Sequence, residues 1–146
     1  MKNLVPYFQH YLDQLCEELA AYPNEEAVWQ LVAGISNSSG TLTLHLIGNL
    51  HHFIGHGLGK MDYIRDRPAE FNTRNVPRVD LVREVKKTRA MVTEILTKVE
   101  NPDAPYPEHL FGKSGTTDFF LYKLLTHLSY HIGQINYHRR ILSNRP

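Results

Sequence analysis

Hydrophobic residues recur at spacings of three and four along most of the chain, which places them on one face of an α-helix. The first such row predicts an amphipathic helix over residues 3–22, which Pro23 ends: Leu4, Phe8, Leu12, Leu15 and Leu19. Asn24 is expected to cap a short helical piece over residues 25–31, which carries the only tryptophan, Trp29. Residues 34–40 are rich in Gly and Ser and are expected to form a loop.

The next segment combines a hydrophobic row with a polar row at the same spacing. Leu42, Leu46, Leu50 and Phe53 predict a second long helix from about residue 41 to residue 57. A polar row runs beside them: His45, Asn49, His52 and His56. Because a buried polar group needs a partner, these side chains are expected either to meet one inside the protein or to lie at its edge.

The second half of the chain predicts two more long helices. Residues 58–79 contain Gly, Pro and Arg and are expected to form a crossover connection, after which Asp80 should cap a third helix reaching Val99. Residues 101–117 are expected to form a long loop, and the last helix should run from Thr117 to about Ser143. The pattern therefore predicts an all-α fold, a four-helix bundle with a long crossover between the second and third helices, as a single domain over residues 1–146.

Composition narrows the classes of function. The 146 residues are 42% hydrophobic and 21% charged with a net charge of +1, and no block of Lys or Arg stands out, so we expect no nucleic-acid partner. No apolar run approaches the roughly 18 residues of a membrane span, so we expect no membrane partner. The single cysteine, Cys16, excludes an internal disulfide, and the N-terminus lacks the apolar stretch of a signal peptide, which together predict a cytoplasmic protein.

The candidate chemistry lies in the last helix. Its predicted seam is half polar: Phe120, Leu124, His127, His131, Gln134, His138 and Ile141. Two histidines four residues apart project from adjacent turns of one helix face, and neutral imidazole is a good ligand for Zn, Ni, Cu or Fe. A third ligand must come from a facing helix, and His45 is the best candidate because its flanking residues are the most apolar. Three protein ligands leave a position open for water or substrate.

Other interpretations of the same residues stay open. A single histidine pair is more often a core or surface hydrogen-bonding pair, but seven of the nine histidines fall in two windows, 45–56 and 127–138, which favours a metal site. Asn49, His52 and Gln134 are expected either to orient ligand rings or bind substrate, or to make ordinary hydrogen bonds within the bundle. His138 could equally face solvent, and three histidines are expected at the surface: His10, His51 and His109.

The sequence resembles the DinB-like superfamily of small helical proteins in two places: residues 44–50 (Leu-His-Leu-Ile-Gly-Asn-Leu) and the motif His127-x-x-x-His131-x-Gly133-Gln134. Residues 65–71 and the Trp29 segment resemble an uncharacterised branch of it. The resemblance implies a four-helix bundle, often a homodimer, that holds a divalent metal such as Zn or Ni. It carries the ligand roles over to His45, His127 and His131.

Several members of that superfamily resemble transferases or isomerases that use low-molecular-weight thiols such as bacillithiol, mycothiol or glutathione. The first hypothesis is therefore a metal-dependent thiol S-transferase with a small-molecule substrate, in which Arg65, Arg67 or Arg74 could receive carboxylates of the thiol. A metal-dependent hydrolase with His52 or Glu70 as general base is the alternative, as is a non-catalytic metal-binding dimeric bundle. No catalytic residue is assigned.

Overall fold

The computed structural model describes residues 3–107 and 112–143. Within these ranges every regular element is helical, as the sequence predicts, and one isolated β-bridge joins Pro105 to Thr116. The elements are α1 (Val5–Ala20), α2 (Glu25–Trp29), α3 (Ser39–Leu50), a π-helical turn η1 (His51–His56), α4 (Arg67–Asn72), α5 (Arg78–Thr97) and α7 (Thr117–Ser143).

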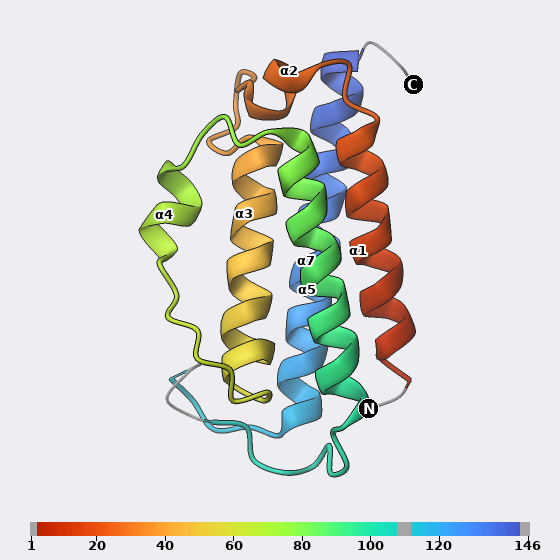
Figure 1. The fold of residues 1–146 in the computed structure, drawn as a ribbon, viewed down its shortest axis with the longest axis vertical. Coiled ribbons are helices and arrows are strands. Elements are labelled where there is room, and N and C mark those ends of the chain that lie inside the picture. Colours follow the sequence, from red (N-terminus) through yellow and green to blue (C-terminus); the bar gives the residue numbers. More distant parts are fainter. Residues whose placement is uncertain (1–2, 108–111, 144–146) are drawn as a thin grey trace.

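Four long helices lie side by side and enclose the core (Figure 1). In this view α1 and α7 run in one direction, while α3 and α5 run in the other, because the segment between α3 and α5 returns along the length of the molecule. Fully buried side chains from all four helices fill the space between them, including Phe8, Leu46, Leu81 and Phe120. The periodic hydrophobic rows of the sequence thus account for the all-helical bundle.

The first two helices are slightly shorter than predicted. α1 ends at Ala20, two residues before the predicted end, and α2 ends at Trp29 instead of residue 31. The predicted cap is present, since the backbone N–H of Ala27 donates to Asn24 Oδ1 at 2.8 Å. Tyr22 is buried beyond the end of α1, so the apolar row continues although the helix does not.

The start of α3 and its far end both differ from the prediction. Ser38 caps the helix by accepting a hydrogen bond from the Thr41 N–H at 3.2 Å, so the helix begins at Ser39, inside the predicted loop. At its other end the α-helix widens into the π-helical turn η1. A π-turn holds more residues per turn than an α-helix, so His52 and His56 leave the row that His45 begins.

The connection from η1 to α5 carries the short helix α4, which lies along the outer side of α3 (Figure 1). Asp66 caps α4 by accepting a hydrogen bond from the Ala69 N–H at 2.9 Å. Glu70 on α4 reaches so close to α3 that a Cβ added at Gly48 would lie 2.1 Å from its Oε1 atom. Only a glycine at position 48 therefore allows this approach.

The two C-terminal long helices follow the prediction except at the two ends of α5, which stops at Thr97 instead of reaching Val99. α5 begins at Arg78, with Pro77 in the N-cap position, so Asp80 does not cap it. Asp80 lies instead in the first turn and forms an ion pair with Arg83 at 2.7 Å, where a negative charge suits the helix dipole. α7 spans Thr117–Ser143 as predicted. No helix in the described ranges has the combination of length and apolar character needed to cross a membrane.

Candidate metal centre

The register of α7 places its histidines at the margin of the core. The buried line runs through Leu124, Leu128, Ile132 and Ile135, whereas His127 and His131 are half-buried beside it. The predicted seam is wrong at Gln134 and Ile141, which are exposed, although His138 between them is buried. A straight helix drifts by about 20° per heptad relative to a strict seven-residue repeat, so a seam drawn at alternating spacings of four and three leaves the buried face.

Three imidazole rings meet between α3 and α7, as the sequence predicts. The Nε2 atom of His127 lies 3.3 Å from Nε2 of His45 and 3.0 Å from Nε2 of His131. One nitrogen from each of the three rings can be chosen so that all three atoms lie within 4.8 Å of one another. The rings stand nearly perpendicular, with interplanar angles of 79° to 90°. Their ring edges therefore point at a common centre.

The His45 ring is held from behind by a buried ion pair. Its Nδ1–H donates to Glu70 Oε2 at 2.9 Å, and Arg65 donates to both oxygens of the same carboxylate at 2.7 and 2.9 Å. Burial raises the pKa of Glu70, but hydrogen bonds from His45 and Arg65 outweigh it and leave the pKa below its ordinary value. Glu70 is therefore an ionised acceptor, which fixes a proton of His45 on Nδ1, so that in the neutral ring Nε2 carries the lone pair.

The His131 ring is fixed in the same way by its own helix. Its Nδ1–H donates to Gln134 Oε1 at 2.7 Å, from one turn further along α7. Because an amide oxygen can only accept, the contact with Gln134 Oε1 places the proton of the neutral His131 ring on Nδ1. The Nε2 atom of His131 is then also a lone pair that faces the other two rings.

The His127 ring stands between the other two. Its Nδ1 atom is buried and has no hydrogen-bond partner within the described part of the chain. Burial lowers the pKa of His127 to about 4, and the positive charges of Arg65 and Lys123 lower it further. Burial also lowers the pKa of His131, against the opposing effect of Gln134. Both rings are therefore neutral at pH 7, the form in which imidazole binds a metal.

The donor set fits a metal ion better than it fits a hydrogen-bonded cluster. With Nδ1 protonated in His45 and His131, two lone pairs face His127, which has at most one hydrogen to offer them. A cation at the centre satisfies all three nitrogens. Ligand nitrogens about 2.05 Å from a tetrahedral Zn²⁺ are separated by about 3.3 Å, close to the observed 3.0 and 3.3 Å.

The residues predicted to support the site have different placements. Gln134 contacts a cluster ring directly, as described above. Asn49 lies one turn beyond His45 on α3, is 7% exposed, and its Oδ1 atom is buried without a hydrogen-bond partner within residues 3–107 and 112–143. His52 is not part of the cluster, because its ring lies against Phe53 and stacks on His56 within η1. His45 is therefore the histidine of the predicted second helix that meets His127 and His131.

Two functional contacts were missed from the sequence: Glu70 holds the His45 ring, and Arg65 holds Glu70. Glu70 was considered only as a general base, whereas it holds His45; the sole sequence signal is the spacing of Arg65 and Glu70 in the crossover. The other two candidate arginines of the crossover make different contacts: Arg67 stacks on Phe71, whose ring centroid lies 5.0 Å from that of His45, and Arg74 donates to the carbonyl oxygens of Phe71 and Thr73.

His138 does not face solvent but is 5% exposed in a buried hydrogen-bond cluster. Its Nε2–H donates to the carbonyl oxygen of Gln30 at 2.8 Å, so its Nδ1 is the acceptor that faces the hydroxyls of Tyr22 and Ser39 at 2.6 and 2.9 Å, which are also hydrogen-bonded to each other. Burial lowers the pKa of His138 although the Gln30 bond opposes the shift. This histidine therefore joins the ends of α1 and α2 to the start of α3.

The three histidines expected at the surface fare differently. His51 is half-buried, and its Nε2 bonds to Thr88 Oγ1 at 3.2 Å, so the expectation is wrong for it. His10 is exposed on α1, as expected. His109 lies outside the described residues.

Comparisons with known proteins agree with this geometry at the level of the fold. A family model described as "Protein of unknown function (DUF1572)" matches residues 1–145. The crystal structure of a DinB-like protein from Bacillus cereus ATCC 10987 superimposes with a TM-score of 0.78 at 14% sequence identity, covering 98% of this chain and 93% of the other. A search of curated proteins found no match. At this identity the structural likeness shows the fold alone.

Proposed function

The chain belongs to the DUF1572 family of proteins of unknown function, and we propose that it is a DinB-like protein that binds one divalent metal ion through His45, His127 and His131. One observation carries the proposal. Glu70 and Gln134 hold the Nδ1 atoms of His45 and His131, so the Nε2 lone pairs of these two rings both face His127. The Nε2 atom of His127 has at most one hydrogen, which cannot satisfy both lone pairs.

The proposed architecture is a single four-helix-bundle domain with a long crossover between the second and third long helices. The parallel directions of α3 and α5 in Figure 1 support it, because two parallel neighbours require a connection that returns the length of the bundle. α4 lies on that connection and supplies Glu70. The crossover would therefore serve the metal site as well as link the helices.

Zn and Ni are the proposed metals, since neutral imidazole suits both. Three nitrogen ligands leave at least one coordination position open, which is the arrangement of a reactive site rather than a closed structural one. The ion when bound supplies a Lewis acid that lowers the pKa of a thiol or water molecule in that position. The chain itself supplies rings with fixed tautomers that are partly buried and neutral. Neutral ligands do not cancel the positive charge of the ion.

The reaction we propose is transfer of a low-molecular-weight thiol to a small-molecule electrophile. The thiol loses its proton to solvent, its sulfur forms a bond to an electrophilic carbon, and a leaving group departs with its electron pair. This chemistry needs no separate general base. Hydrolysis does need one, and the engagement of Glu70 by Arg65 and His45 makes that carboxylate a poor base. A metal-dependent hydrolase is therefore the less supported alternative.

Elemental analysis of the purified protein tests the metal site. We expect about one equivalent of metal per chain in the wild type and loss of that metal in His127→Ala and His45→Ala. His10→Ala is the matched control, because His10 is exposed on α1 away from the cluster. Equal metal content in all four proteins would refute the three-histidine site.

A second experiment tests the reaction. The metal-loaded protein is assayed for conjugation of bacillithiol, mycothiol and glutathione with 1-chloro-2,4-dinitrobenzene and other electrophiles. We expect turnover with one of these thiols and its loss in His127→Ala. A protein that holds metal but turns over no thiol would leave a non-catalytic metal-binding bundle as its function.

We also propose that the chain forms a homodimer, as the resemblance implies. Exposed aromatic side chains support a contact surface formed by the start of α7 and by α1, where Tyr122 of α7 and Tyr7 of α1 are 55% and 58% exposed. They line neighbouring depressions that share Thr126. Sedimentation equilibrium tests this: we expect a dimer in the wild type and a shift toward monomer in Tyr122→Glu.

A further inference from the structure

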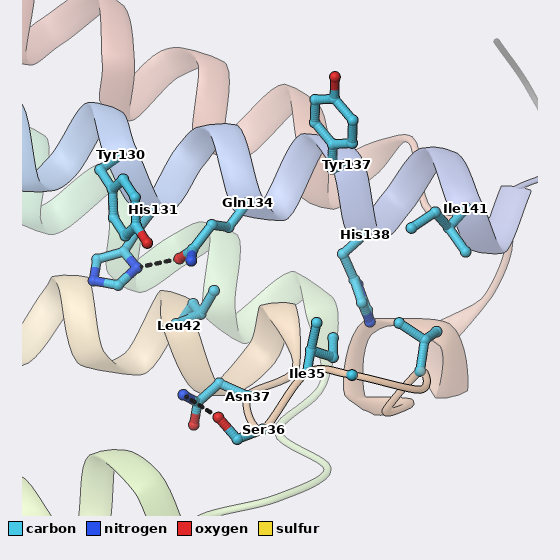
Figure 2. A pocket seen from close by; sticks show the side chains of 12 residues that line it. Ile35, Ser36, Asn37, Leu42, Tyr130, His131, Gln134, Tyr137, His138 and Ile141 are labelled. Atoms are coloured by element: carbon cyan, nitrogen blue, oxygen red, sulfur yellow. Dashed lines mark hydrogen bonds between the residues drawn. The ribbon is translucent and has the colours of Figure 1, made fainter.

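A cavity of about 450 Å³ opens beside the ring of His131, on the side of α7 that faces the segment between α2 and α3. Figure 2 shows His131, Gln134 and His138 directed from α7 toward this space, with Leu42 of α3 and residues 35–37 on its other side. Its volume lies within the range of roughly 300 to 1,000 Å³ typical of small-molecule sites. The cavity and the histidine cluster share the His131 side chain.

The side chains that line the cavity are either apolar or polar without a formal charge. Apolar surface comes from Val32, Ile35, Leu42, Tyr130 and Ile141, of which the last two remain 64% and 57% exposed. None of its lining residues is Asp, Glu, Lys or Arg. The arginine and lysine that act on His127, Arg65 and Lys123, are not among the lining residues. A ligand that enters this cavity thus gains apolar contacts but no partner for a charge.

One polar group that lines the cavity, the side-chain amide of Gln134, is held in a fixed orientation by its hydrogen bond with His131. Because the Gln134 oxygen accepts the hydrogen bond from His131 Nδ1, the amide nitrogen carries two hydrogens that no described residue accepts. Figure 2 shows this amide at the edge of the cavity beside the His131 ring. His138 offers nothing comparable, because both of its ring nitrogens are already hydrogen-bonded. The cavity therefore presents a hydrogen-bond donor next to the proposed metal.

From this we infer that the cavity binds an uncharged, mainly apolar small molecule with a carbonyl-type hydrogen-bond acceptor, and that this molecule is the electrophile that receives the thiol. The second part rests on the proposed function; the binding of a neutral ligand does not. A charged thiol cofactor does not fit these walls, since burying a carboxylate there without a cation costs free energy. The two reactants are thus expected to reach the metal from different sides.

A matched pair of unreactive probes tests the inference on the metal-free protein by calorimetric titration: methyl 4-nitrobenzoate, which is neutral, and 4-nitrobenzoate, which carries a carboxylate on the same frame. We expect the ester to bind at least about tenfold more tightly than the carboxylate. Equal affinity, tighter binding of the carboxylate, or no binding of the ester would overturn the inference.

Variants locate the binding. Ile141→Glu places a charge at the cavity wall and is expected to weaken ester binding at least about tenfold, whereas Val79→Glu, at an exposed aliphatic site on α5, should leave it unchanged. Gln134→Glu keeps an acceptor for His131 but lacks the amide hydrogens, and is expected to weaken ester binding about fivefold or more. Unchanged affinity in Ile141→Glu would place the ester elsewhere and refute the site.

Metal content and ester binding, both measured in the same variants, distinguish a failure of the cavity site from a failure of the proposed metal site. His127 does not line the cavity, so His127→Ala should lose metal yet bind the ester within about twofold of wild type. Ile141→Glu should show the reverse, with metal retained and ester binding weakened. Loss of ester binding in His127→Ala would refute an independent cavity, and metal-free wild type that still binds the ester would leave this inference standing without the metal.

Discussion

Replacing Glu70 by alanine should lower the free energy of unfolding through the loss of its contact with Arg65, and should lower metal affinity through the loss of its contact with His45. The carboxylate is 7% exposed and accepts two hydrogen bonds from Arg65, whose side chain is 13% exposed, and one from His45. Removal of one partner from a buried ion pair costs roughly 3–5 kcal/mol because it strands a charge. Arg65 retains some access to water, so we expect the lower end, about 3 kcal/mol, or roughly 6–12 °C in Tm for a chain of this length.

The effect on the metal is separate from the effect on stability. Without Glu70, the Nδ1–H of His45 loses the acceptor that fixes its tautomer, and loss of such a contact to a ligand histidine lowers metal affinity about 10- to 100-fold. Urea unfolding of the metal-free protein measures the first effect. Zinc titration in competition with a chromophoric chelator measures the second.

Two further variants make the test specific. Glu84→Ala removes an exposed glutamate whose ion pairs with Lys87 and Arg83 lie at the surface, and should change stability by less than about 0.5 kcal/mol. Arg65→Met in the Glu70→Ala background removes the stranded charge and should restore much of the stability but none of the zinc affinity. The reasoning is refuted if Glu70→Ala matches Glu84→Ala in both measurements.

Three other predictions concern substitutions at Gly48, Gly133 and His138. Gly48→Ala should lower stability by roughly 1–3 kcal/mol and weaken zinc binding, because its Cβ would displace the pinned Glu70 carboxylate; equal zinc affinity would contradict this. Gly133→Ala should raise stability by about 0.5–1 kcal/mol in thermal unfolding, because its Cβ meets no atom within 4 Å in the middle of α7. The pKa of His138 is lowered in the folded protein by burial, so the unfolded chain takes up its proton first and stability should fall as the pH drops below about 6.5. Urea unfolding at pH 7 and pH 5 should show a smaller loss in His138→Gln than in the wild type, and equal losses would contradict the assignment.

The sequence was sufficient for the fold class because helical periodicity is a local property. Rows such as Leu4 to Leu19 specify which face of a helix is apolar, and four such helices have few ways to bury those faces. The same local signals located the cap at Asn24 and the full extent of α7. They failed at η1, because the widening of a helix into a π-turn depends on its neighbours and leaves no periodic signal.

The histidine cluster was predictable in part. The spacing of His127 and His131 is local, and the choice of His45 followed from its apolar neighbours and from the resemblance, so their convergence was found from the sequence. The partner of His45 was not. Glu70 lies 25 residues away on a short crossover helix, and nothing in the sequence states which side of α3 that helix will cover.

The sequence by itself thus determined the long helices and most of their apolar faces, since each depends on residues within a few turns of one another, and together with the resemblance it identified the three histidines. The tertiary structure alone decided which ring nitrogen carries each proton, because that depends on whether Glu70 and Gln134 stand behind the rings. It also decided that His138 is buried among hydroxyls and that a neutral cavity opens beside His131. Protonation, burial and cavity shape are properties of neighbours distant in sequence, and only packing brings those neighbours together.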